Sequence, residues 1–94
     1  MIVHVKFYAT LRDIVKSKSV DFSFDHNPKA FELLEAVVAR FPEMKKELLM
    51  PDGRLFGHVH FFINGRDIQF WEDDLSTIIN PDDSVSIFPA VGGG

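Results

Sequence analysis

Hydrophobic and polar residues alternate along several stretches of the chain, a pattern typical of β-strands with one buried and one open face. The side chains expected to face inward are Val3, Val5 and Phe7 in the first stretch, Val20, Phe22 and Phe24 in the second, Val59, Phe61 and Ile63 in the third, and Val85 and Ile87 in the last. The first two stretches are expected to pair as an antiparallel hairpin. Residues 9–15, which connect them, lose the alternation and predict a short helical corner.

Between the second and third expected strands, apolar residues recur at helical spacing instead. This pattern predicts one amphipathic helix, and its core-facing stripe is expected to consist of Phe31, Leu34, Val38 and Phe41. Asn27 is the expected N-cap, Pro28 suits the first helical position, and Pro42 is expected to end the helix near Phe41. Residues 43–50 predict a further helical turn, whereas residues 66–79 carry scattered apolar residues and predict no regular element.

This order of elements predicts a two-layer α+β domain, with a mixed sheet and one main helix packed on one face. The other face of the sheet is then open. Tyr8, Phe62 and Phe88 are out of phase with the inward-facing positions of their strands, so they are expected on this open face. An exposed aromatic patch predicts a docking surface. The alternative is that the irregular segment 66–79 folds over it.

The composition limits the kind of partner. The chain has 94 residues and a formal net charge of −4, so one domain is expected, and no basic stripe is present for nucleic acid. A basic protein surface is a more natural match. No apolar run reaches the length of a membrane span, and the N-terminal residues have no signal-type pattern, so they are expected to be part of the mature structure. The absence of cysteine excludes disulfides, thiolate metal sites and a nucleophilic cysteine in this chain, and it fits the expectation of a cytoplasmic protein.

Other candidate sites are weaker. His58 and His60 lie two apart on an expected strand, as metal ligands can, but no acidic residue or cysteine beside them completes a site. We therefore interpret them as surface histidines and expect no metal. The acidic stretches 72–74 and 82–83 are more often simply solvated than used to attract a basic partner. No phosphate-binding loop and no nucleophile elbow occurs, so no cofactor is expected on this chain, and any ATP must be bound by a partner.

The last residues are Phe-Pro-Ala-Val-Gly-Gly-Gly. Glycine loses more conformational freedom on ordering than any other residue, so this segment gains little by packing on its own domain. Pro89 cannot donate to a sheet, and strand pairing is expected to end near it. We predict a folded domain over residues 1–89 and a flexible tail over residues 90–94, which is either a frayed end or the working part of the protein.

Three segments, FYATLRDIV, FINGRDI and DDSVSIFPAVGGG, resemble the small sulfur-carrier family with the ubiquitin-like β-grasp fold. The small subunit of molybdopterin synthase is a member of this family. The most specific match is Phe88-Pro89-x-Val91, followed by Gly92 as a spacer and by Gly93-Gly94. Ala90 stands where a second proline is common. The longer stretch 64–85 looks more like the archaeal-type small ubiquitin-like modifiers.

The resemblance implies a function for the tail. A carboxylate is unreactive at neutral pH, and the family uses a separate ubiquitin-activating-like adenylyltransferase and ATP to activate it. Sulfur from a persulfide then leaves Gly94 as a thiocarboxylate. Val91, Gly92 and Gly93 are expected to lie in a narrow partner groove, since glycine has no Cβ to collide there. The expected docking residues are Tyr8, Phe62, Phe88 and Pro89.

Several acceptors fit this chemistry. The first hypothesis is a sulfur carrier for molybdopterin or tungsten-pterin synthesis, which inserts its tail into the large subunit of molybdopterin synthase and has no catalytic side chains of its own. The second is a protein modifier that is joined through Gly94 to lysine amines. Carriers for thiazole synthesis or tRNA thiolation are further alternatives. A plain interaction module with an idle tail is the remaining interpretation.

Overall fold

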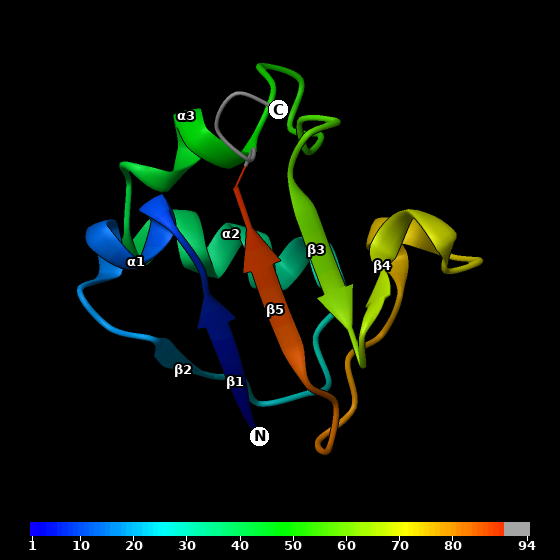
Figure 1. The fold of residues 1–94 in the computed structure, drawn as a ribbon. Coiled ribbons are helices and arrows are strands. Elements are labelled where there is room, and N and C mark those ends of the chain that lie inside the picture. The colour runs from blue at the N-terminus through cyan, green and yellow to red at the C-terminus, as the bar shows by residue number, and fades with distance from the viewer. Residues whose placement is uncertain (90–94) are drawn as a thin grey trace.

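A single mixed sheet is the central element of residues 1–89, which are the residues that the computed structural model describes (Figure 1). Its strands are β1 (Ile2–Phe7), β2 (Ser19–Ser23), β3 (His60–Ile63), β4 (Arg66–Asp67) and β5 (Val85–Phe88), in the spatial order β2-β1-β5-β3-β4. β1 and β5 are parallel, whereas the other neighbours are antiparallel. The four predicted strands and the first hairpin are confirmed.

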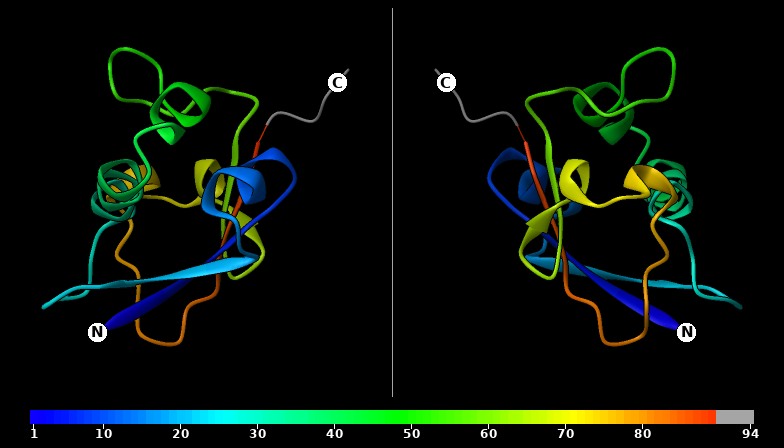
Figure 2. Two further views of the ribbon diagram at one scale, coloured as in Figure 1. Left: turned by 90° about the vertical axis from the view of Figure 1, so that its left-hand side faces the viewer. Right: turned by 90° about the vertical axis from the view of Figure 1, so that its right-hand side faces the viewer.

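The main helix, α2 (Ala30–Arg40), covers one face of this sheet. Figure 1 looks onto the opposite face, with α2 behind the strands, and Figure 2 shows the two layers from the side. The predicted helical corner is α1 (Thr10–Val15), and the predicted further turn is α3 (Met44–Leu48). The predicted fold class, an α+β domain with one main helix on a mixed sheet, is therefore confirmed.

The expected start and orientation of α2 were wrong. The helix begins at Ala30 with Lys29 as its N-cap, and its buried face consists of Ala30, Leu33, Leu34 and Val37. Of the expected stripe, Leu34 is buried, Val38 and Phe41 are half-buried, and Phe31 is 39% exposed. The reason is a contact distant in sequence, because Lys29 pairs with Ile78 in a short antiparallel bridge. This bridge keeps the backbone of Lys29 extended, so the helix begins only at Ala30, beyond Asn27 and Pro28.

One hydrophobic core lies between α2 and the sheet. The inward-facing residues predicted for β1, β3 and β5 are all buried, and those of β2 are buried except for Phe24, which is half-buried. The alternating pattern of a strand predicts which of its side chains are buried, because successive side chains point to opposite faces of the sheet. The same alternation leaves Tyr8, Phe62 and Phe88 half-buried on the open face.

Residues 66–79 do not fold over the open face. A two-residue turn at Asn64-Gly65, both with positive φ, reverses the chain into β4. Two short 3₁₀ turns follow, η1 (Ile68–Phe70) and η2 (Asp74–Ser76), and they lead from the sheet edge to the α2 layer (Figure 2). There Ala30 N donates to Thr77 O (2.9 Å) and Ile79 N donates to Pro28 O (2.8 Å). The open face therefore keeps its aromatic side chains accessible.

Candidate functional site

Three aromatic side chains from three neighbouring segments meet on the open face, and we call them the aromatic row. Phe88, at the end of β5, lies in the middle. The Tyr8 ring stacks on it with the centroids 4.1 Å apart and the planes 5° from parallel. The Phe62 ring meets it edge to face, with the centroids 5.4 Å apart. The structure thus brings together three of the four predicted docking residues.

The sheet register explains why these rings meet. Phe7 pairs with Ile87 across the parallel β1–β5 contact, and Tyr8 N extends this pairing by donating to Ile87 O (3.3 Å). On the other side, Phe62 and Ser86 are opposite each other in the antiparallel β3–β5 pair. Tyr8 and Phe62 therefore flank the strand that carries Phe88, and each ring leans on it. The aromatic row is therefore built on the central strand of the sheet.

A polar group lies at each end of the aromatic row. The Arg12 guanidinium carbon lies 4.8 Å from the centroid of the Tyr8 ring, and Arg12 Nε donates to Phe7 O (2.7 Å). At the other end the His60 ring stacks on Phe62 with the centroids 5.9 Å apart. An apolar strip with a hydrogen-bonding group at each end can select a partner by charge as well as by shape.

His60 is held by an acidic partner that its sequence neighbours do not reveal. His60 Nδ1 lies 2.9 Å from Asp67 Oδ2, and Asp67 is only 8% exposed. The other Asp67 oxygen accepts a hydrogen bond from Gln69 N (3.1 Å). The Asn64-Gly65 turn predicts that Phe62 and Asp67 pair across the hairpin, so the signal was present in the sequence.

The two histidines considered as metal ligands have different environments. His58 precedes β3 and stacks on Phe56 (5.1 Å between centroids), whereas His60 pairs with Asp67. Within residues 1–89, no group of three or more histidine and acidic side chains is arranged to hold a metal ion. None of the helices in the described range is long and apolar enough to cross a bilayer.

Pro89 differs from the other predicted docking residues because it is buried. It fixes the end of β5 and offers little surface to a partner. The remaining predicted site residues, Val91, Gly92, Gly93 and Gly94, lie outside the described residues, as does the predicted boundary of the tail. Their roles stay predictions.

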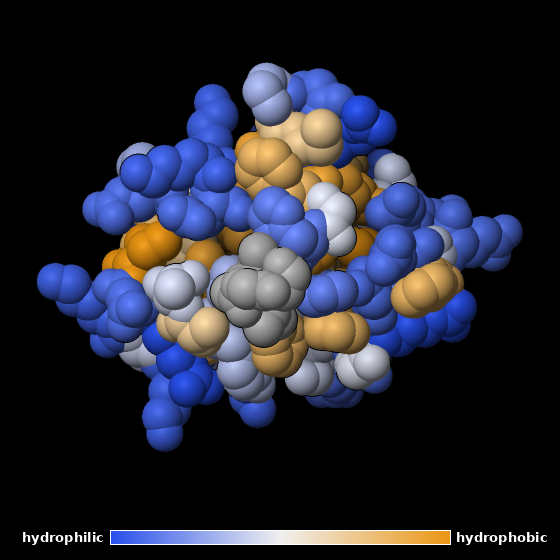
Figure 3. Space-filling model, turned by 45° about the horizontal axis from the view of Figure 1, so that its top comes forward, coloured by the Kyte–Doolittle hydropathy of each residue, from blue (hydrophilic) through white to orange (hydrophobic). Residues whose placement is uncertain are grey.

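Hydrophobic surface also gathers at the end of the molecule where β5 finishes (Figure 3). Part of it is a shallow groove beside α3, which is lined by Pro42, Lys45, Lys46, Leu49, Met50 and Phe56. The sequence pattern does not predict this groove, because its apolar residues come from the segments before and after α3 and only the fold brings them together. A partner that binds the aromatic row from this end meets further apolar surface.

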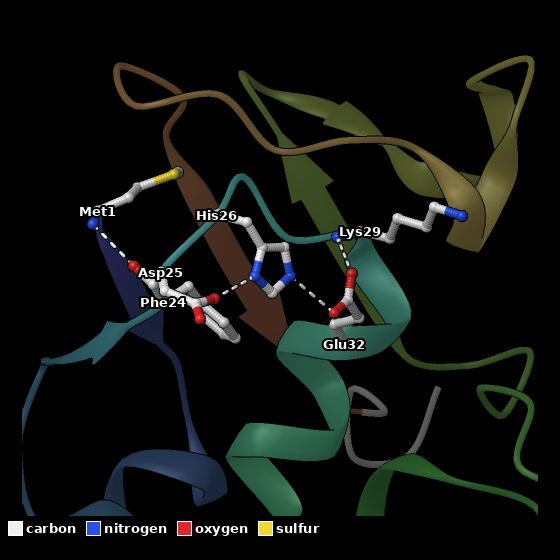
Figure 4. Close-up of polar contacts among 6 residues, drawn as sticks. All are labelled: Met1, Phe24, Asp25, His26, Lys29 and Glu32. Carbon is white, nitrogen blue, oxygen red and sulfur yellow. Dashed lines mark hydrogen bonds and ion pairs between the residues drawn. The ribbon is translucent and has the colours of Figure 1, made fainter.

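A separate polar cluster joins the end of the β2 segment to the start of α2 (Figure 4). His26 Nδ1 lies 2.6 Å from Asp25 Oδ1, and His26 Nε2 lies 2.9 Å from Glu32 Oε2. Glu32 Oε1 also accepts a hydrogen bond from Lys29 N (3.0 Å) at the helix start. The hydrogen bonds to Asp25 and then to Glu32 raise the pKa of His26, and the backbone donor of Lys29 lowers the pKa of Glu32. We interpret the cluster as a clasp for the first turn of α2.

The sheet topology and the single main helix define a ubiquitin-like β-grasp protein, and the aromatic row lies on its open face. A family model described as "ThiS family" matches residues 5–94, and the chain belongs to this family. The "Small archaeal modifier protein 3" of Haloferax volcanii is 31% identical over 94 residues, which is 100% of both chains. The chain is therefore a member of the group of ubiquitin-like sulfur carriers and modifiers.

Solved structures agree with this fold. The crystal structure of SAMP1 from Haloferax volcanii superimposes with a TM-score of 0.84 at 24% identity and covers 100% of both chains. A chain of the Amycolatopsis orientalis BexX/CysO complex superimposes with a TM-score of 0.80 at 26% identity, and the match covers 98% of this chain and 99% of that one. The predicted ubiquitin-like β-grasp fold is confirmed.

Proposed function

We propose that this protein is a cytoplasmic sulfur carrier that bears a thiocarboxylate on Gly94 and donates the sulfur to molybdopterin or tungsten-pterin synthesis. One observation carries the proposal. Phe88 belongs both to the aromatic row and to the Phe-Pro-x-Val motif that precedes the glycines. A partner that binds the row therefore holds the protein a few residues before the terminal glycines in the sequence.

The proposed chemistry takes place on partners. An adenylyltransferase joins the Gly94 carboxylate to the α-phosphate of ATP and releases pyrophosphate. A persulfide then attacks the acyl carbon and AMP leaves. A second thiol cleaves the resulting disulfide and frees the thiocarboxylate. This division of one difficult substitution into easier steps is the usual advantage of covalent intermediates. The large subunit of molybdopterin synthase is the proposed acceptor.

The proposal is supported by family membership and by the side chains of residues 1–89. Among these residues the aromatic row offers a surface for binding, and the chain contains no cysteine that can carry sulfur on a side chain. A solved relative in the BexX/CysO complex is consistent with a carrier that works together with a partner protein.

A test uses the purified chain, ATP, a persulfide donor and the activating enzyme of the same host. We expect an intact mass that corresponds to the exchange of one oxygen for one sulfur, and a product that reacts with an alkylating reagent as a thioacid. The matched control is the chain without Gly93 and Gly94, which should stay unmodified. Equal modification of both chains would rule the carrier function out.

A second function, protein modification, is favoured by the full-length relative that is named a small archaeal modifier protein. The activation step is the same, but the nucleophile that attacks the acyl carbon is a lysine amine and not a persulfide. Proteolysis of host proteins should then release peptides with a glycine remnant on lysine. Transfer to a thiazole or tRNA acceptor remains a further alternative and is tested by supplying those acceptors to the thiocarboxylate form.

A further inference from the structure

The outer edge of β2 has no strand beside it among the described residues. β2 is the first strand in the spatial order and pairs only with β1. At the end of this pair, Met1 and Phe24 exchange two backbone hydrogen bonds, each 2.8 Å long. Antiparallel pairs alternate between bonded and non-bonded residues, so Phe22 and Val20 also point their backbone groups toward β1.

The alternate residues Ser19, Asp21 and Ser23 consequently direct their backbone N–H and C=O groups outward. Two side chains confirm this direction. Arg40 Nη1 donates to Asp21 O (2.9 Å), and Ser17 Oγ donates to Ser19 O (2.9 Å). These two carbonyl groups are thus covered by side chains. Within residues 1–89, the outward N–H groups have no neighbouring strand to accept from them.

A groove lies beside this edge, between β2 and the C-terminal end of α2. Its apolar lining comes from Val15, Val20 and Phe41. Arg40 also lines it, and its guanidinium carbon lies 5.5 Å from the Phe22 centroid and 5.6 Å from the Phe41 centroid. The edge therefore offers backbone donors and the groove offers pockets for side chains, which are the two components of strand addition.

The charged residues beside the groove indicate which kind of peptide segment can bind there. Arg40 forms no ion pair with a described residue; its hydrogen bond is to a neutral carbonyl group. The Asp21 carboxylate is held by His4 Nδ1 at 2.5 Å, on the open face of the sheet. The exposed Lys16 and Lys18 precede the strand. Although the chain is acidic overall, this edge presents positive charge to an incoming segment.

We propose that the outer edge of β2 binds an extended segment of a partner protein, with apolar residues facing the groove and an acidic residue facing Arg40. The incoming backbone accepts from the N–H groups of Ser19 and Asp21 and donates to Asp21 O. Arg40 leaves this carbonyl group and pairs with the carboxylate of the partner. Arg40 thus protects a free strand edge when the site is empty and adds specificity when it is filled.

This site is separate from the centre of the aromatic row, Phe88, because β1 lies between β2 and β5. The opposite edge of the sheet is a poor alternative. β4 has two residues, and the chain continues from it directly into η1. A partner bound to β2 therefore leaves the docking face and the glycine segment free for an activating enzyme. The inference does not depend on which acceptor receives the sulfur.

The test uses a capped peptide, Asp-Val-Ile-Val-Ile-Asp, titrated into the full ¹⁵N-labelled chain and followed by NMR. We expect the largest shift changes at the amides of Ser19, Asp21 and Ser23 and at the Arg40 side chain. A peptide with lysine in place of both aspartates should bind at least about tenfold more weakly, since a charge-assisted hydrogen bond is lost. Changes centred on Tyr8, Phe62 and Phe88, or no binding by the acidic peptide, would overturn the proposal.

Matched variants separate the contribution of the β2 backbone to peptide binding from the contribution of the Arg40 side chain. Asp21→Pro removes an outward N–H without removing a bond to β1, and it should abolish peptide binding. Asp21→Ala keeps that N–H and should bind normally. Arg40→Gln should weaken binding about tenfold, whereas Lys46→Gln on α3 should not. Equal binding by Asp21→Pro and Asp21→Ala, or by the two charge variants, would contradict the inference. Concentration-dependent broadening of β2 amides without peptide would instead assign the edge to a second copy of this chain.

Discussion

The rings of Tyr8 and Phe88 stack almost in parallel across the β1–β5 pair, with 5° between their planes. The contact joins residues far apart in the chain, and the middle member of the aromatic row, Phe88, directly precedes the last described residue. Aromatic pairs of this kind add to the stabilisation that comes from buried area alone. The pair therefore contributes both to the fold and to the proposed recognition of partners.

Phe88→Glu tests the docking face. The change places a charge in the centre of the aromatic row, and we expect it to weaken binding to the activating enzyme at least about tenfold, as for the loss of a central interface residue. Because Phe88 is half-buried, the domain should remain folded. Calorimetric titration measures the affinity. Phe70→Glu is the control, since Phe70 is 64% exposed and lies outside the row. An unchanged affinity of the Phe88 variant would exclude the row as the docking surface.

Deletion of Gly93 and Gly94 tests the proposed carrier segment. The deletion removes no side chain from the core, so the thermal midpoint should stay nearly unchanged. It moves the terminal carboxylate back by roughly 7 Å at extended spacing, and activation should be abolished. Thermal denaturation and mass spectrometry measure the two effects. Gly94→Ala, which adds one methyl group beside the carboxylate, is expected to fold normally and to react slowly. A large loss of stability in the deletion variant would show that these glycines are structural.

The clasp at the start of α2 predicts a pH-dependent stability. The pKa of His26 is raised in the folded protein, so the favourable contribution of protonated His26 is present at low pH and is lost as the pH rises through this raised value. Glu32 has a lowered pKa and stays ionised across that range. The free energy of unfolding is measured with urea at about pH 5.5 and at about pH 8.5. Its decrease from the lower to the higher pH should be larger for the natural chain than for His26→Gln. Identical pH profiles would show that the clasp does not stabilise the fold.

The orientation of α2 can be tested with two neighbouring residues. Leu33 is fully buried, and Leu33→Ala should lower the free energy of unfolding by about 2–5 kcal/mol. Phe31 is 39% exposed, and Phe31→Ala should cost about 1 kcal/mol or less. Urea denaturation measures both values. The opposite ranking would mean that the helix packs with the face expected from the sequence pattern.

The faces of the strands could be predicted from the sequence, whereas the face of α2 could not. Side chains of a strand alternate with a period of two. A strand that buries Val85 and Ile87 must therefore point Phe88 to the open face of the sheet. The helix carries apolar residues on more than one side, and both Phe31 and Leu33 fit a helical period. The choice depends on the bridge between Lys29 and Ile78, which lie far apart in the chain. The Asp67–His60 contact depends on the hairpin and not on adjacent residues, and the Asn64-Gly65 turn that forms this hairpin is visible in the sequence.

The central position of β5 has a consequence for synthesis of the protein. Residues 85–88 lie between β1 and β3, so a nascent chain can form its hairpin and its main helix but not its complete sheet until these residues leave the ribosome. The aromatic row is assembled in the same event, because Phe88 is its middle member. Any partner that recognises the row would thereby distinguish molecules with a complete sheet from molecules in which β5 has not yet paired.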